Sequence, residues 1–198
     1  MTVPFRLGLT GSIGMGKSTT AGLFRAEGVP VWDADAAVHR LYAPGGAAVA
    51  PLAALHPPAL VDGGIDRGAL KAWIAADPSA LSRIEAVVHP LVGADRADFI
   101  SQATADIVVL DIPLLFEGGS DAMMDATLVV TAPPALQRAR VLARPGMTEA
   151  QFDTILSRQM PDRDKRARAT HIIETLAMES VRACVIALIA YIRSTRHA

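Results

Sequence analysis

Residues 11–18 read Gly11-Ser12-Ile13-Gly14-Met15-Gly16-Lys17-Ser18 and match the pattern G-x-x-x-x-G-K-[ST]. The apolar residues before them, Phe5–Thr10, are predicted to form a short buried strand, and Lys17–Glu27 a helix that ends at Gly28. Glycines let backbone N–H groups turn inwards around phosphate groups, and the start of a helix adds the positive end of its dipole. The stretch therefore predicts a phosphate-binding loop.

Within this loop each residue type has an expected role. Lys17 would reach the β- and γ-phosphates of ATP, and the Ser18 hydroxyl would be a ligand of Mg²⁺. A glycine-rich turn with a solvated lysine is the alternative, but a strand before and a helix after the pattern favour the phosphate loop. The candidate ATP-binding residues are Gly11, Gly14, Met15, Gly16, Lys17, Ser18 and Thr19.

Further apolar segments alternate with helical ones along the chain. Strands are predicted at Val29–Asp33, Ile107–Ile112, Ala126–Thr131 and His171–Glu174. Helices are predicted at Ala34–Tyr42, Asp66–Ala76, Ser79–Val88, Pro134–Ala143, Thr148–Met160 and Met178–Arg193. This order predicts an α/β fold with a parallel sheet covered by helices on both faces. We expect one domain over residues 1–198, with a helical insert at about 44–104 and a short lid at about 134–165.

Acidic residues follow two of the predicted strands, where parallel sheets bind their ligands. Asp33 and Asp35 end the second strand; one could accept a proton from an attacking hydroxyl, and the other could hold Mg²⁺ through water. The alternative role is that of a helix N-cap, because Asp35 stands directly before the helical residues Ala36–His39. Asp111 ends the third strand and is a candidate metal ligand, with an ordinary turn residue as the alternative.

Basic residues gather between Pro134 and Thr170, where eight basic and four acidic residues give a net charge of +4. Arg140 and Arg144 are four residues apart and are expected to share a helix face. We interpret the segment as a lid, with Arg140 in a catalytic role and Arg144 on the triphosphate. A solvated helix face is the alternative, and for Arg163–Arg168 it is the favoured one.

Composition limits the partners and the compartment. The net charge of −1 gives no overall bias towards nucleic acid or membranes, and no apolar run reaches the ~20 residues of a membrane span. The start of the chain lacks a secretory signal, and the single cysteine, Cys184, excludes an internal disulfide and is expected to be buried. We therefore expect a cytoplasmic monomer or weak homo-oligomer that binds neither nucleic acid nor membrane.

Several motifs in a fixed order resemble the dephospho-CoA kinase family. The segment Gly8–Thr19 is similar to the family's G-L-T-G-G-I-G-S-G-K-S-T, and Asp33-Ala34-Asp35 to its D-A-D. Ile84–Pro90 resembles L-E-x-I-x-H-P, and Asp111–Glu117 resembles D-x-P-L-L-F-E. Gln137, Arg140, Arg144 and Arg158-Gln159 stand where the family has Q-x-x-R, a further Arg and R-Q. The match runs from about residue 5 to 175.

This resemblance implies a P-loop kinase fold and the last step of coenzyme A synthesis, in which ATP phosphorylates the ribose 3′-hydroxyl of dephospho-CoA. It implies that the proton acceptor is Asp35, the second Asp of D-A-D. The helical insert would help to form the acceptor pocket, whose residues would be Asp33, His89, Pro113, Leu114, Leu115 and Glu117.

The chain departs from the family pattern at two places. Ser12 replaces a glycine in the loop, which is compatible with a negative φ. Near the end, where the family usually reads A-D-x-x-I-x-N-x-G, Thr175 and Ala177 replace the Asn and the Gly of a loop close to the adenine.

Other classes of protein share the phosphate loop. A nucleoside or nucleotide kinase is disfavoured by Pro113–Glu117, and an ATPase that moves a partner by the small size of the chain. A GTP-dependent switch needs an N-K-x-D motif, which a sequence without Asn cannot contain.

Overall fold

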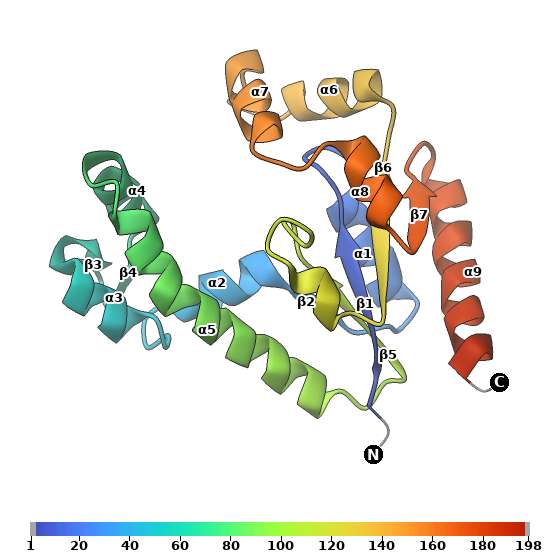
Figure 1. Ribbon diagram of the computed structural model, residues 1–198, viewed down its shortest axis with the longest axis horizontal. Coiled ribbons are helices and arrows are strands. Elements are labelled where there is room, and N and C mark those ends of the chain that lie inside the picture. The colour runs from blue at the N-terminus through green and yellow to red at the C-terminus, as the bar shows by residue number, and fades with distance from the viewer. Residues whose placement is uncertain (1–2, 197–198) are drawn as a thin grey trace. The chain divides into compact units, whose positions relative to one another are not determined.

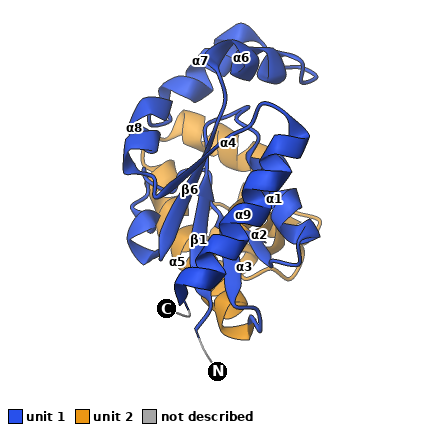
Figure 2. Cartoon of the chain, turned by 90° about the vertical axis from the view of Figure 1, so that its right-hand side faces the viewer, with its two compact units in different colours: residues 1–32, 103–198 blue, residues 33–102 orange. Residues whose placement is uncertain are grey.

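The computed structural model describes residues 3–196 and divides into two compact units. One unit comprises residues 33–102, and the other comprises the rest of the described chain (Figure 2). The larger unit, coloured blue in Figure 2, contains the phosphate loop. The domain boundaries expected from the sequence, with an insert at about 44–104, stay a prediction.

A five-stranded sheet lies at the centre of the larger unit (Figure 1). Its strands are β1 (Phe5–Thr10), β2 (Val31–Asp33), β5 (Ile107–Asp111), β6 (Ala126–Thr131) and β7 (His171–Glu174). Their order is β2-β5-β1-β6-β7; β1 pairs in parallel with β5 and β6, and β6 pairs in parallel with β7. The predicted parallel α/β fold is confirmed.

The sheet is buried on both faces because its strands are apolar in both registers. Leu7 and Leu9 of β1 face α1 (Lys17–Ala26) and α9 (Met178–Arg196), with which they form one core. On the other face, a Cβ on Gly8 would be 3.0 Å from Leu115 Cδ2, so the segment after β5 packs closely there. All residues of β5 and β6 are buried.

Three short helices follow β6, and α8 lies against this strand. They are α6 (Pro134–Leu142), α7 (Glu149–Ser157) and α8 (Asp162–Arg168). The sequence did not predict α8, although Asp162 and Asp164 near its start and basic residues near its end suit the helix dipole. A single 3₁₀ turn, η2 (Ser120–Met123), precedes β6.

The unit of residues 33–102 has a hydrophobic core of its own, built around Leu41, Leu52, Leu70 and Ile84. Its elements are α2 (Ala34–Tyr42), α3 (Val49–Leu55), η1 (Pro57–Ala59), β3 (Leu60–Val61), β4 (Gly64–Ile65), α4 (Arg67–Ala76) and α5 (Ala80–Gln102). Strands β3 and β4 form a hairpin whose turn holds Asp62 and Gly63 at φ 49° and 78°. Asp-Gly is a recognised hairpin signal, although no strands were predicted on either side of it.

Helix α5 is much longer than predicted. The expected helix at Ser79–Val88 continues through Pro90 to Gln102. A proline inside a helix removes one backbone hydrogen bond and costs about 3 kcal/mol. Here the helix continues because it packs along α2, α3 and α4 within the same unit.

The expectation of a buried Cys184 is wrong, since its side chain is exposed. Helix α9 buries the stripe of Val181, Val185, Leu188 and Ile192, and Cys184 lies outside that stripe. Among the described residues, no helix combines the length and apolar character that a membrane span needs.

Candidate active site

Two glycines of the phosphate loop adopt backbone conformations that other residues disfavour. Gly14 has φ 78° and Gly16 has φ 87°. A Cβ on Gly14 would be 2.5 Å from Val141 Cγ2, and one on Gly16 would be 3.0 Å from Thr175 Oγ1. Asp62 is the only non-glycine residue with positive φ in the part of the chain that is described, so Ser12 fits the loop as expected.

Two glutamines hold the peptide groups of Ile13 in the loop. Gln137 Nε2 donates to the carbonyl oxygen of Ile13 at 2.8 Å, and the N–H of Ile13 donates to Gln159 Oε1 at 3.0 Å. Gln137 belongs to α6, and Gln159 follows α7. The loop is therefore held from both sides by the segments that follow β6.

The loop leads directly into the N-terminus of α1. Gly16 is the N-cap and makes no side-chain hydrogen bond, and Lys17 is the first helical residue. The next two residues, Ser18 and Thr19, are exposed, whereas Gly11 and Met15 are buried. The first N–H groups of α1 can therefore bind an anion, and the Ser18 hydroxyl is accessible.

Asp111 lies at the end of β5 and forms an ion pair with Lys17 Nζ. Its side chain is 2% exposed, and that of Lys17 is 16% exposed. The structure thus brings two predicted site residues together, from segments more than 90 positions apart in the sequence. No cluster of three or more His, Cys, Asp or Glu suited to a metal occurs among residues 3–196.

The segment after Asp111 is held against β1. The Thr10 hydroxyl donates to the carbonyl oxygen of Pro113 at 3.0 Å. Leu115 is fully buried, whereas Leu114 is 47% exposed. Of these two candidate substrate contacts, only Leu114 presents its side chain to solvent.

Glu117 makes internal contacts with the residues around α8. Its Oε1 lies 2.9 Å from Nζ of the fully buried Lys165 and accepts a hydrogen bond from the Met160 N–H at 2.8 Å. Burial raises the pKa of Glu117, but the hydrogen bonds from Lys165 and Met160 lower it by more, so the pKa lies below its ordinary value. The Glu117 carboxylate therefore links the end of the 113–117 segment to α8.

In the unit of residues 33–102, the two aspartates of the D-A-D step have different surroundings. Asp33 is the N-cap of α2, and its Oδ1 accepts from the Ala36 N–H at 3.0 Å. Because α2 begins at Ala34, Asp35 lies in a helical turn and the strand does not continue through it. Asp35 is exposed in the first turn and has no hydrogen bond or ion pair to another described residue. His89 is exposed in the middle of α5, not at a helix end.

The two candidate lid arginines also differ. Arg140 donates from Nη1 to Thr175 Oγ1 at 2.9 Å and from Nη2 to the carbonyl oxygen of Thr175 at 2.5 Å. Arg144 is exposed and has no side-chain partner among the described residues. The expected common helix face is wrong, because α6 ends at Leu142 and Arg144 follows it.

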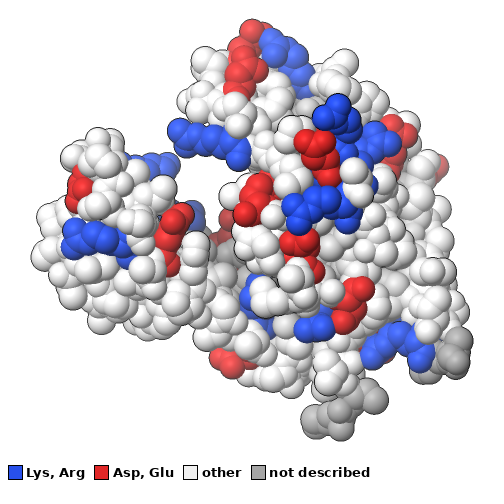
Figure 3. All heavy atoms as spheres, in the orientation of Figure 1, with Lys and Arg blue, Asp and Glu red and all other residues white. Residues whose placement is uncertain are grey.

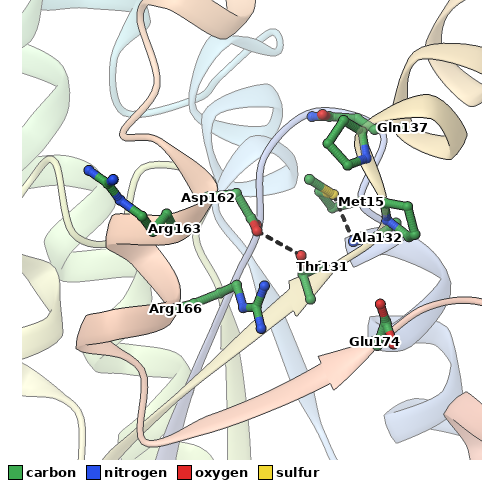
Figure 4. A pocket seen from close by; sticks show the side chains of 10 residues that line it. Met15, Thr131, Ala132, Gln137, Asp162, Arg163, Arg166 and Glu174 are labelled. Atoms are coloured by element: carbon green, nitrogen blue, oxygen red, sulfur yellow. Dashed lines mark hydrogen bonds between the residues drawn. The ribbon is translucent and has the colours of Figure 1, made fainter.

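A pocket of about 310 Å³ lies beside the loop, between the ends of β6 and β7 and the helix α8 (Figure 4). The Thr131 hydroxyl donates to Asp162 Oδ2 at 2.8 Å, and the Ala132 N–H donates to Met15 Sδ at 3.0 Å. Arg166 and Glu174 also line the pocket, which therefore carries both signs of charge. Its position fits the ligand edge of a parallel sheet.

Charges of both signs also mix on the outer surface of this unit. On the face shown in Figure 3, acidic and basic side chains alternate over the region of α8, and much of the remaining surface carries neither. Arg168, for example, lies 2.8 Å from Asp121 Oδ2. This face therefore has no large patch of a single charge.

The fold and the site together define a P-loop kinase. The parallel sheet has the strand order β2-β5-β1-β6-β7, the glycine-rich loop lies at the N-terminus of α1, and Lys17 lies beside the strand-end Asp111. The family model described as Dephospho-CoA kinase matches residues 5–178. The Dephospho-CoA kinase of Cereibacter sphaeroides is 73% identical over 195 residues, which cover 98% of this chain and 99% of that protein.

Solved structures share this fold. A crystal structure of a protein from Thermus thermophilus has a TM-score of 0.84 and 38% identity, covering 96% of this chain and 98% of that chain. The Dephospho-CoA kinase from Campylobacter jejuni has a TM-score of 0.67 at 20% identity with the same coverage, and so shares the fold. The chain belongs to the dephospho-CoA kinase family.

Proposed function

We propose that the chain transfers the γ-phosphoryl group of ATP to the ribose 3′-hydroxyl of dephospho-CoA, which gives coenzyme A in the last step of its biosynthesis. Family membership over nearly the whole chain carries this proposal. The phosphate loop supports it, because its glycines, Lys17 and the first turn of α1 are arranged to bind a triphosphate.

On the donor side, we propose that Lys17, the loop N–H groups and Arg144 stabilise the negative charge of the phosphoryl group during its transfer. Preorganised donors of this kind contribute most where charge develops in the transition state. Arg144 is suited to the role because its guanidinium is exposed and unpaired within the described chain. Arg140, which the sequence placed in a catalytic role, would act at the base of the lid.

Ser18 and Asp111 are the residues proposed to hold Mg²⁺. Mg²⁺ usually keeps several water ligands and uses one or two protein ligands together with the phosphates. An exposed hydroxyl at the start of α1 and a carboxylate at the end of β5 fit that requirement. When bound, the ion would neutralise charge on the phosphates.

On the acceptor side, we propose Asp35 as the group that accepts the hydroxyl proton. Its carboxylate is exposed and unpaired within the described residues, whereas the carboxylate of Asp33 is engaged as a helix cap. Asp33, His89, Pro113 and Leu114 would contact dephospho-CoA. Leu115, which is buried, and Glu117, which is paired with Lys165, would support Pro113 and Leu114 within the larger unit.

For the remaining properties we propose a cytoplasmic enzyme that acts as a monomer or weak homo-oligomer and binds no nucleic acid. The near-zero net charge supports the last point.

An acceptor screen tests the proposed function. ADP release would be followed in a coupled assay with dephospho-CoA, adenosine, shikimate and nucleoside monophosphates as alternative acceptors. We expect turnover with dephospho-CoA to exceed the others by a large factor. Faster ADP release with a nucleoside monophosphate or shikimate would refute dephospho-CoA as the acceptor, but it would not contradict the assignment of the phosphate loop.

A further inference from the structure

Thr175 follows β7 directly and is one of the few buried polar residues of the larger unit. The residue is 5% exposed, and its N–H donates to the carbonyl oxygen of Thr131 at 2.8 Å. In the family pattern this position is usually an asparagine, which Thr175 replaces. Its hydroxyl lies where β6, β7, α6 and the phosphate loop meet.

The direction of the hydrogen bonds at Thr175 follows from the chemistry of its neighbours. A guanidinium can only donate, so Thr175 Oγ1 accepts from Arg140 Nη1 at 2.9 Å. The single hydroxyl proton is then free for a carbonyl oxygen, either that of Met15 at 2.9 Å or that of Thr131 at 3.2 Å. Met15 is favoured, since the distance is shorter and the Thr131 oxygen already accepts from the Thr175 N–H.

The side chain of Thr175 also packs directly against the loop glycine. A Cβ on Gly16 would be 3.0 Å from Thr175 Oγ1 and 3.1 Å from its Cβ and Cγ2. Arg140 holds Thr175 a second time, through the hydrogen bond from Nη2 to the Thr175 carbonyl oxygen. Thr175 is thus fixed by α6 on one side and touches two consecutive loop residues on the other.

We propose that Thr175 is a positioning residue for ATP binding, and that it acts through a hydrogen-bond chain from Arg140 through its own hydroxyl to the Met15 carbonyl. This chain fixes the phosphate loop relative to the base of the lid. Met15 and Gly16 come just before Lys17, so their peptide orientation sets the N–H groups that receive the phosphates. The inference rests on the proposed function only in taking ATP as the ligand of the loop.

Replacing the hydroxyl by a methyl group breaks the chain with little change in volume. Thr175→Val leaves the Met15 carbonyl and Arg140 Nη1 without this partner. We expect Kd for a non-hydrolysable ATP analogue to rise about 10-fold, since hydrogen bonds to charged groups carry that much affinity. Thr175→Ser, which keeps the hydroxyl, should stay within about 3-fold of wild type.

Thr127 offers a matched control at the other end of the same strand pair. The residue is 7% exposed, and its hydroxyl accepts from the Thr170 N–H at 3.0 Å. Thr127→Val therefore removes a buried hydroxyl between β6 and β7 without touching the phosphate loop. It should lower the melting temperature about as much as Thr175→Val and leave Kd for the ATP analogue unchanged.

The experiment is calorimetric titration of each folded variant with the ATP analogue, without acceptor, together with the Arg140→Ala/Thr175→Val double variant. The double variant should bind the ATP analogue no more weakly than Arg140→Ala alone, because either substitution already breaks the same hydrogen-bond chain. The proposal is overturned if Thr175→Val binds the analogue as tightly as Thr127→Val, or if Thr175→Ser binds it as weakly as Thr175→Val. It is also overturned if the affinity losses of Arg140→Ala and Thr175→Val multiply in the double variant. Should Thr175→Val fail to fold, Thr175→Ala replaces it under the same criteria. Because no acceptor is present, failure of the proposed kinase reaction would show separately, as absent turnover of dephospho-CoA by the wild type.

Discussion

At the scale of single residues, Lys17 is the side chain of the phosphate loop whose role is easiest to test. It is one of three lysines in the chain, it opens α1 and it pairs with Asp111. The sequence predicted both residues as site residues, because each has a recognisable local pattern. The pairing between them was not predictable, since it depends on β1 and β5 being neighbours in the sheet.

Lys17→Ala should nearly abolish phosphoryl transfer, because the ammonium follows negative charge onto the γ-phosphate in the transition state. The variant should still fold, since the ammonium lies at the loop and not in the core. ADP release with dephospho-CoA measures the loss, and Lys71→Ala, at an exposed position of α4, is the control. A folded Lys17→Ala enzyme with a tenth of wild-type activity would refute the assignment.

Asp35→Asn should lower kcat by about 10²-fold or more, which is within the usual range for loss of a general base. Asp35 has no described partner, so the melting temperature should not change. The sequence left capping and catalysis open for Asp35, but the cap is Asp33, because α2 begins at Ala34.

Asp33→Asn is the matched control, because asparagine caps a helix about as well as aspartate. It should change the Mg²⁺ requirement more than kcat. Normal turnover of Asp35→Asn together with an inactive Asp33→Asn would reverse the two roles. Normal turnover of both would make the pair structural.

At the scale of helices and strands, periodicity predicted the main elements well and failed where tertiary packing decided. The strands Phe5–Thr10, Ala126–Thr131 and His171–Glu174 have the predicted bounds. Helix α5 runs past Pro90 because its neighbours in the unit stabilise it, and no local pattern could show that. Helix α8 is short and strongly charged, so it lacks the apolar period on which helix prediction depends.

The lid interpretation belongs to this scale, and Arg144 tests it. Arg144→Ala should lower kcat by about 10²-fold while changing ATP affinity little, because a residue that closes over the phosphates acts mainly on the transition state. Arg138, whose Nη2 lies 2.5 Å from Glu149 Oε1, is the control in the same segment. Steady-state kinetics with ATP and dephospho-CoA as varied substrates give both quantities. Equal, small losses of kcat for Arg144→Ala and Arg138→Ala would indicate that this segment is only a solvated surface.

Over the whole molecule, the family motifs contain residues that hold the phosphate loop, but the motifs do not show which contacts these residues make. Gln137 and Gln159 were quoted only as parts of a pattern, yet both bind the backbone of Ile13. Glu117 was assigned to the substrate, and its described contacts are with Lys165 and Met160. These contacts join residues 40 or more positions apart, and a sequence without a known topology does not reveal such partners.

The pair Glu117–Lys165 makes a prediction about stability as a function of pH. The pKa of Glu117 is lower in the folded protein than its ordinary value of about 4.3, so folding favours the ionised form. The stability from this pair is therefore complete above about pH 4.3 and is lost as the pH falls through the lowered folded-state pKa. Melting temperatures measured from pH 8 to pH 3 should show this loss in the wild type.

Glu117→Gln should be less stable at pH 7 by about 3 kcal/mol, because it leaves the buried Lys165 ammonium without its anionic partner. The double variant Glu117→Gln/Lys165→Met should recover much of that loss, since an apolar side chain needs no partner. It should also lose less stability than the wild type between pH 5 and pH 3, because the titrating carboxylate is gone. Glu85→Gln, at an exposed position of α5, is the control and should follow the wild-type curve. If the double variant lost stability in acid as steeply as the wild type, the acid sensitivity would come from other carboxylates, of which Asp125 beside Arg6 and Asp106 beside Arg193 also have lowered pKa values.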